Sequence, residues 1–290
     1  MTLVQLLLNG VALGAAYALV ALGFVFIVNA TGAVNFAQGD LVMAGGYAAI
    51  SLSSLVPIPF LFLLPAVALV TFVLGIVVAL VAYFPLMRRP PATVFISTLL
   101  CGMILQNLFL VAFGPEAKSG PALVGSGMLH FAGLELSRQA AGTIVVAALV
   151  IVLQHFVFAR TQFGRRLRAT AQDREMAEAV GIPAKLLIAT TFGLGTALAG
   201  VAGALLANQY FVYPTGGIPL SVFAYIAVVI GGWGSLGGAV IGSLIISIFQ
   251  VVVSAYVSYA VATGSLYATL LLIFFLRPQG IFSERVQRRA

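Results

Sequence analysis

Charge is scarce in this sequence of 290 residues. Charged side chains make up 7% of the chain and hydrophobic side chains make up 62%. A soluble domain carries about 25% charged residues and about half apolar ones, so this composition indicates an integral membrane protein. The long apolar runs are continuous rather than alternating, which favours membrane-spanning helices over spanning strands.

Several chemical groups are also rare. The single cysteine, Cys101, excludes an intrachain disulfide and a cysteine metal site. The two histidines, His130 and His155, are expected near opposite faces, with no HExxH or GxSxG motif beside them. We therefore predict no catalytic, cofactor-binding or metal-binding residue, and no enzyme. The two lysines, Lys118 and Lys185, each follow an alanine, so neither belongs to an ATP-binding P-loop.

Apolar stretches of about 20 residues predict the membrane spans. Near the C-terminus, the glycine run 231–238 would interrupt a helix, so Ser221–Ile230 is expected as a short crossing or a re-entrant half-helix. We expect one all-α membrane domain over residues 1–290, a polytopic bundle of about eight or nine transmembrane helices with broken or re-entrant segments. The other expected spans are Leu3–Val28, Phe36–Val56, Phe60–Met87, Thr93–Phe113, Ala140–Ala159, Leu186–Ala207, Ala239–Ala255 and Tyr259–Leu276.

The basic residues indicate how the chain is oriented. They gather at Arg88–Arg89, over residues 160–185 and in the C-terminal tail at Arg277, Arg285, Arg288 and Arg289. The positive-inside rule assigns all three groups to the cytoplasm. Counting spans back from Arg88 places the N-terminus on the outer side, and the C-terminus is cytoplasmic. Because these basic residues lie beside membrane segments, no nucleic-acid partner is expected.

Nine of the 21 charged residues lie between Arg160 and Lys185. We call residues 160–185 the charged island. A segment with this many charges cannot lie in lipid, so it is expected to face water. Within it, Asp173 to Val180 is expected as a short helix. Asp173 can serve as its N-cap, Glu175 lies in the first turn, and Gly181 follows its end.

A helix this short is not stable alone and needs a partner surface. Met176, Ala177 and Val180 are expected on one side of it, and Arg174 and Glu178 on another. Two interpretations remain open on spacing alone. The island is either a solvated loop whose arginines only fix the topology, or a helix that docks into a groove of a cytoplasmic subunit.

Four segments carry a resemblance to a known family. They are GAVNFAQGDLVMAGGYAA at 32–49, AQDREMAEAVGIPAK and the following helix at 171–207, VIGGWGSLGGAVIGS at 229–243, and LRPQGIF at 276–282. In this order they resemble permeases of ABC importers for branched-chain amino acids, and within that family the LivH-type inner-membrane subunit. Glycine-rich motifs are weak singly, but four in the expected order cover nearly the whole chain.

The resemblance implies a permease subunit of an ATP-driven importer for branched-chain or other hydrophobic amino acids. It implies a multi-pass protein of the bacterial inner membrane with a periplasmic N-terminus, in contact with membrane lipid. It also implies three protein partners: a second homologous permease subunit, cytoplasmic ATP-binding subunits and a periplasmic substrate-binding protein. The charged island then becomes a cytoplasmic coupling loop. Its expected ATPase contacts are Asp173, Arg174, Glu175, Met176, Ala177, Glu178, Val180 and Gly181.

The substrate path is less defined. Polar residues in or near the spans are its candidates, although hydrogen bonding between helices explains them equally well. These candidates are Asn35, Gln38, Asn107 and Asn208. Asp40, the only charge in the first 87 positions, is expected to complement the dipole at a helix start.

Two alternatives stay open. An ion-coupled secondary transporter of small polar solutes would need charged residues inside the membrane, and uptake that requires ATP rather than an ion gradient would separate it from an importer. An ABC permease for urea or amides is the other alternative, because the partner binding protein often sets selectivity.

Overall fold

A computed structural model describes residues 3–55, 59–125, 127–131 and 134–276. These residues form an almost entirely helical membrane protein, as predicted. The C-terminal basic tail and most of the motif at 276–282 lie outside the described residues. The elements are α1 (Leu3–Thr31), α2 (Gln38–Leu55), α3 (Phe60–Val78), α4 (Pro91–Phe113), β1 (Met128–Phe131), β2 (Leu134–Ser137), α5 (Arg138–Arg160), α6 (Gln162–Gln172), α7 (Arg174–Ala179), α8 (Ala184–Tyr210), α9 (Gly217–Gly231), α10 (Leu236–Tyr256) and α11 (Tyr259–Leu276).

Within the described residues, six helices are long and apolar enough to cross a membrane. They include α1, α4, α5, α8 and α10, and the sixth runs from Phe62 to Leu86. The helix α9 has 15 residues, fewer than the roughly 20 that a straight crossing needs, in keeping with the expected short crossing or re-entrant half-helix. The total of eight or nine spans stays a prediction.

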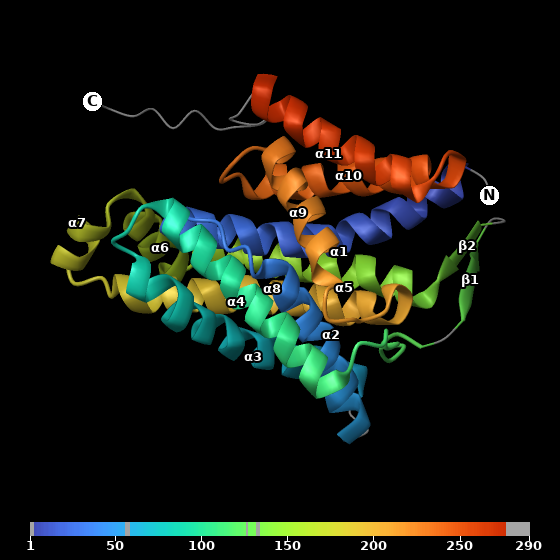
Figure 1. Ribbon diagram of the computed structural model, residues 1–290, viewed down its shortest axis with the longest axis horizontal. Coiled ribbons are helices and arrows are strands. Elements are labelled where there is room, and N and C mark those ends of the chain that lie inside the picture. The colour runs from blue at the N-terminus through green and yellow to red at the C-terminus, as the bar shows by residue number, and fades with distance from the viewer. Residues whose placement is uncertain (1–2, 56–58, 126, 132–133, 277–290) are drawn as a thin grey trace.

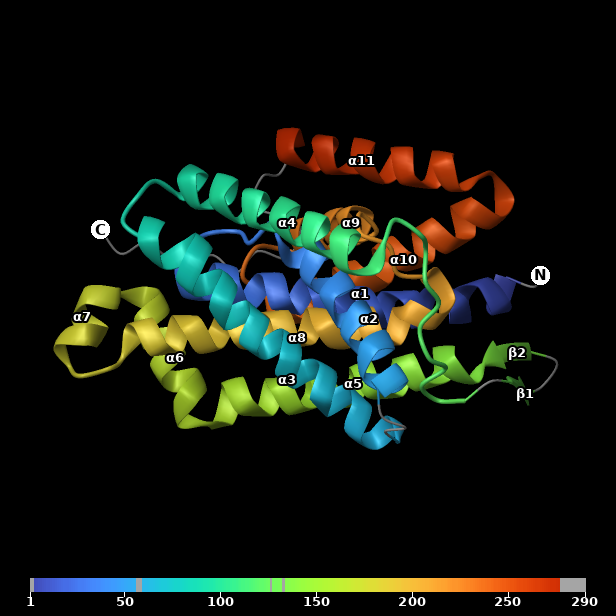
Figure 2. The same cartoon turned by 60° about the horizontal axis from the view of Figure 1, so that its bottom comes forward.

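The long helix α1 forms the centre of the bundle. It packs against α8, α10, α5 and α9. Figures 1 and 2 show α6 and α7 at one end of the molecule, with the start of α1 and the β1–β2 hairpin at the opposite end. We call these the island end and the hairpin end.

The helix α2 begins inside the bundle rather than at its surface. After α1 ends at Thr31, the chain turns back inward, and the side chain of Gln38 donates a hydrogen bond to the carbonyl oxygen of Gly195 at 3.0 Å. Gly195 lies about 16 Å along α8 from its first residue, at 1.5 Å per residue. The sequence predicted a span over Phe36–Val56; the helix found there is Gln38–Leu55, and its first residue bonds to α8 inside the bundle.

Glycines let α2 cross α8 at very short range. A Cβ atom added to Gly203 would lie 1.8 Å from the carbonyl oxygen of Val42, and one added to Gly45 would lie 2.1 Å from the carbonyl oxygen of Gly200. Only residues without side chains permit such an approach between membrane helices. We call this crossing the glycine seam. The sequence of α8 carries small residues at helical spacing, a pattern that predicts close packing of two helices, and Gly203 of the seam is one of them. These residues are Gly195, Ala199, Gly203 and Ala207.

Three features differ from the expectation. The predicted span Phe60–Met87 is broken near its end by a π-helical turn, Ala79–Tyr83, and a 3-10 turn, Phe84–Leu86. Pro85 accounts for this break, since proline lacks an N–H and clashes with the preceding helical turn. The β1–β2 hairpin and the helix α6 lie in segments for which the sequence predicted neither a strand nor a helix.

Candidate functional site

The charged island folds into two consecutive helices, α6 and α7, joined at Asp173. Thr161 caps α6, because its hydroxyl oxygen accepts a hydrogen bond from the backbone amide of Gly164. On the inner face of α6, Leu167 is buried and packs with Leu187 of α8 and Ala30 of α1. The arginines of α6 are exposed. The helix is therefore anchored by an apolar face, while its charges face outward.

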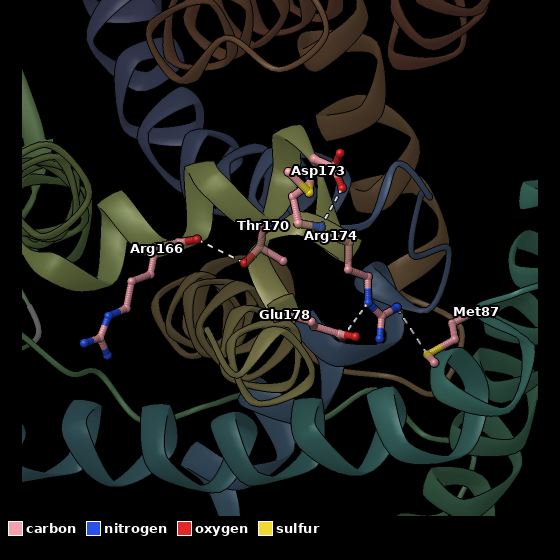
Figure 3. A network of polar contacts seen from close by, with 7 residues as sticks. Met87, Arg166, Thr170, Asp173, Arg174 and Glu178 are labelled. Carbon is pink, nitrogen blue, oxygen red and sulfur yellow. Dashed lines mark hydrogen bonds and ion pairs between the residues drawn. The ribbon is translucent and has the colours of Figure 1, made fainter. Parts of the chain in front are cut away.

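Asp173 begins α7. Its carboxylate accepts a hydrogen bond from the backbone amide of Met176, with a separation of 3.0 Å between the oxygen and nitrogen (Figure 3). Glu175 lies in the first turn, where a negative charge interacts favourably with the helix dipole. The predicted N-cap is confirmed.

Gly181 ends α7. Its φ angle is +81°, a conformation that glycine adopts without strain. The amide of Gly181 donates to the carbonyl oxygen of Glu178 at 3.1 Å, and the amide of Ile182 donates to that of Ala177 at 2.9 Å. This pair of bonds is a Schellman motif, which satisfies carbonyl groups that would otherwise be left free at the helix end. The predicted terminating role of Gly181 is confirmed.

The side chains of α7 divide into an outer and an inner set. Met176 is 65% exposed and Val180 is 74% exposed, whereas Ala177 is only 4% exposed. The sequence placed these three residues on one side, but the structure turns Ala177 toward the rest of the chain. The outward-facing apolar surface of α7 consists of Met176 and Val180, and we call it the α7 patch.

Arg174 links α7 to a second part of the bundle. Its guanidinium lies 3.1 Å from a carboxylate oxygen of Glu178, one turn further along α7. The same guanidinium donates to the sulfur of Met87 at 3.4 Å, just beyond the broken end of the α3 segment (Figure 3). The helix α7 thus contacts the chain in three places: at α6, at the turn into α8, and at Met87.

The candidates Asn35 and Gln38 lie together at the buried start of α2. The amide of Asn35 donates to the side-chain oxygen of Gln38 at 3.4 Å, and its own oxygen accepts from the backbone amide of Ala37 at 3.1 Å. Gln38 in turn donates to Gly195. Both side chains are therefore occupied in holding the inward loop and the start of α2.

Asp40 is buried in the first turn of α2, as expected for an acid at a helix start. Its carboxylate accepts a hydrogen bond from the side chain of Gln106 on α4 at 2.8 Å. The sequence could not identify Gln106 as this partner, since the two residues are 66 positions apart.

Asn107 follows Gln106 and is exposed on α4, where its side chain donates to the carbonyl oxygen of Met103 at 2.8 Å. Gln106 and Asn107 line a cavity of about 250 Å³ together with the turn at residues 213–215. Asn208 lies elsewhere and donates to the carbonyl oxygen of Gly120 at 3.0 Å. The four path candidates are therefore not brought into one site. In the described part of the chain, no group of three or more metal-ligating side chains could hold a metal ion.

Comparison with known proteins reveals relatives along the whole chain. A family model described as "Branched-chain amino acid transport system / permease component" matches residues 6–276. The chain is 33% identical over 295 residues to the high-affinity branched-chain amino acid transport system permease protein LivH of Salmonella typhimurium, covering 97% of this chain and 95% of that protein. It is 31% identical over 293 residues to the permease protein BraD of Pseudomonas aeruginosa, with the same coverage.

A more distant relative transports a different class of solute. The fructose import permease protein FrcC of Rhizobium meliloti is 29% identical over 175 residues, which cover 57% of this chain and 48% of that protein. The family model and the full-length likeness to LivH agree with the resemblance carried by the four sequence motifs. The chain belongs to the family of branched-chain amino acid transport system permeases.

Proposed function

We propose that this chain forms the translocation path of an ATP-driven importer for branched-chain or other hydrophobic amino acids, and that α7 couples it to a cytoplasmic ATPase subunit. The observation that carries the proposal is the α7 patch. Met176, within this helix of six residues, and Val180, its C-cap residue, are both exposed, and the helix is capped at both ends. An apolar surface at the tip of a charged segment is the kind of surface that a partner protein covers.

The hydrogen bonds of α7 support its role as a lever. The caps at Asp173 and Gly181 satisfy backbone groups at both ends, so the helix can move as one body. A displacement of α7 would reach α8 through the turn at Gly181 and the broken α3 segment through Arg174 and Met87. In this proposal, closure of the ATPase subunits moves α7 and switches the path between outward and inward access.

The proposed topology places the island end in the cytoplasm, the N-terminus in the periplasm and the C-terminus in the cytoplasm. It is supported by the six basic residues of the island and by the position of α1, which starts at the opposite end (Figure 1). A periplasmic substrate-binding protein would then meet the hairpin end.

A second permease subunit is proposed to cover the outer face of α4. Only 22% of the most apolar stretch of α4 is buried within this chain, the same share as in α5, so burial alone does not distinguish α4. Asn107 is exposed on this helix, and an amide facing hydrocarbon would be costly. The cavity beside Gln106 and Asn107 is therefore our candidate for part of the path between two permeases.

The proposed substrate class rests on the extent of likeness. LivH and BraD, both named for branched-chain amino acid transport, match 97% of this chain at 33% and 31% identity, whereas the fructose import permeases match either a smaller share of it (57% at 29% identity) or match it at lower identity (89% at 23% identity). This difference favours an amino acid over a sugar as the transported solute.

Cysteine crosslinking tests the coupling role of α7. In a Cys101→Ala background, we expect Val180→Cys and Met176→Cys to crosslink to an ATPase subunit in the assembled transporter. Ala177→Cys is the matched control, because this position lies on the same helix but is buried. It should neither crosslink nor react with a bulky water-soluble maleimide. Free maleimide labelling of both exposed positions in the assembled complex would disprove the docking.

A further inference from the structure

A slot lies between α5 and the turn that leads into α10. It consists of two cavities, one of about 420 Å³ and one of about 240 Å³, which share His155, Leu236 and Gly237 in their walls. We call it the α5–α10 slot. The larger cavity reaches the arginine-bearing helix α6, and the smaller one extends along α5 and α10 toward the centre of the bundle. None of the path or ATPase-contact candidates lines it.

The mouth of the slot is basic. Arg168 lines it, and one guanidinium nitrogen of Arg168 donates to the carbonyl oxygen of Phe158 at 2.6 Å. This bond fixes the guanidinium at the mouth and leaves its other N–H groups available to a ligand. No described residue that lines either of the two cavities carries a carboxylate. A negatively charged group at the mouth would therefore meet no repulsive partner.

The first turn of α10 adds donors at the same place. Ser235 caps this helix by accepting a hydrogen bond from the amide of Gly238 at 3.1 Å. The amides of Leu236 and Gly237 belong to the first turn, where an α-helix offers free N–H groups and a positive dipole end. A Cβ atom added to Gly237 would meet nothing within 4 Å, so space is open beside this backbone.

A buried polar side chain lies deeper in the slot. Gln154 of α5 is 8% exposed, and its side-chain oxygen is buried without a hydrogen-bond partner. It lines the smaller cavity, whose other walls include Leu22, Ile151 and Val240. An unsatisfied buried amide is costly and calls for a polar ligand group. A half-turn of the terminal side-chain torsion exchanges the amide oxygen and the NH2 group, so Gln154 can present its NH2 group as a donor to a ligand acceptor such as an ester carbonyl.

The order of these groups matches one class of ligand. We propose that the α5–α10 slot binds an anionic phospholipid. The phosphate would lie between Arg168 and the first turn of α10, a lipid ester would reach Gln154, and an acyl chain would lie against Ile151 and Val240. The absence of carboxylates at the mouth gives no partner to the cation of a zwitterionic headgroup, so anionic lipids are preferred.

The surroundings of α5 favour lipid over a free anion. Leu149, Val152 and Leu153, which flank the slot on α5, are all more than half exposed. Such an apolar surface on a membrane-spanning helix is solvated by acyl chains, so a lipid reaches the slot from the bilayer. A soluble phosphate would fill only the mouth and would leave Gln154 unsatisfied.

Native mass spectrometry of the purified full chain in detergent tests this site, with phosphatidylglycerol and phosphatidylcholine as the added lipids. We expect one retained phosphatidylglycerol and weaker retention of phosphatidylcholine. Arg168→Gln should weaken phosphatidylglycerol retention about fivefold, the effect expected for one basic side chain at an anionic lipid. Gly237→Leu, which fills the open space, should abolish the retained lipid.

Matched variants separate this site from general surface charge. Arg165→Gln removes the same charge from α6 outside the slot, and Gly264→Leu adds the same side chain at another helical glycine with open space. Both should retain lipid as the parent chain does. The proposal is overturned if the two lipids bind equally, if Arg165→Gln and Arg168→Gln have equal effects, or if inorganic phosphate displaces the lipid.

Discussion

The charged island and the glycine seam are built by opposite means. In the island, the bonds that define α7 join residues three to five positions apart, as between Asp173 and Met176 or Ala177 and Ile182. In the seam, the contacts join distant segments, and the bond between Gln38 and Gly195 spans 157 positions. The island is therefore specified locally, whereas the seam exists only when α1, α2 and α8 have assembled.

This contrast has consequences for stability. Helices in a membrane gain little from the hydrophobic effect when they associate, so close van der Waals contact is decisive. The glycine seam supplies that contact in the middle of the bundle. In α7, by comparison, Ala177 is the only buried residue. Elements with so few buried contacts open more readily than the rest of a fold, which suits a part that must move.

The largest expected effect comes from disrupting the seam. Gly203→Leu would force a side chain into a position where even a Cβ atom lies 1.8 Å from the carbonyl oxygen of Val42. We expect a loss of about 1–3 kcal/mol or more in the free energy of unfolding, because the backbones must separate. Thermal unfolding of the purified chain in detergent measures this loss.

Gly264→Leu is the control for that substitution. Gly264 lies in α11, and a Cβ atom there would meet nothing within 4 Å. The control should unfold at nearly the same temperature as the parent chain. Equal destabilisation by the two variants would show that glycine matters here through backbone conformation rather than through close contact.

A smaller and more local effect is expected at the cap of α7. Asp173→Ala removes the acceptor for the amide of Met176 and should cost about 1 kcal/mol of local helix stability. Hydrogen exchange of the α7 amides should accelerate accordingly, while the global unfolding temperature stays unchanged. Asp173→Asn keeps an acceptor oxygen and should restore slow exchange. A fall in the global unfolding temperature would mean that α7 is part of the cooperative core.

The same contrast explains what could be predicted from the sequence. The caps of α7 were predictable because Asp173 and Gly181 act on neighbouring backbone groups. The bounds of the long helices were predictable from hydropathy, to within a few residues at most ends. The helix α6 was missed because its arginines dominate the composition, although Leu167 anchors it to the bundle.

Non-local contacts could not be predicted from one sequence. Nothing in the residues 32–38 shows that α2 starts beside Gly195, or that Gln106 binds Asp40 across 66 positions. The burial of Ala177 was also not predictable, because the elements packed against a short helix decide which of its faces is buried. The sequence did indicate that small residues would line a helix contact, but not which helices would meet there.

The smallest expected effect concerns the ion pair on α7. Arg174 and Glu178 are four positions apart, and their side chains are 26% and 45% exposed. A double-mutant cycle with Arg174→Ala, Glu178→Ala and the double variant should give a coupling energy of about 0.3 kcal/mol, because solvent screens the pair and Arg-before-Glu is the weaker order on a helix. Hydrogen exchange of α7 at low and high salt measures it, and the energy should decrease with salt.

The value of this coupling energy also tests whether α7 is held less firmly than the glycine seam. Each single variant also loses interactions outside the ion pair; Arg174→Ala, for example, removes the contact with Met87. The double-mutant cycle subtracts these losses and leaves only the coupling energy between Arg174 and Glu178. A salt-independent coupling above about 1 kcal/mol would place the pair in a desolvated network. The helix α7 would then be held as firmly as the glycine seam, and a lever that moves independently of the core would be ruled out.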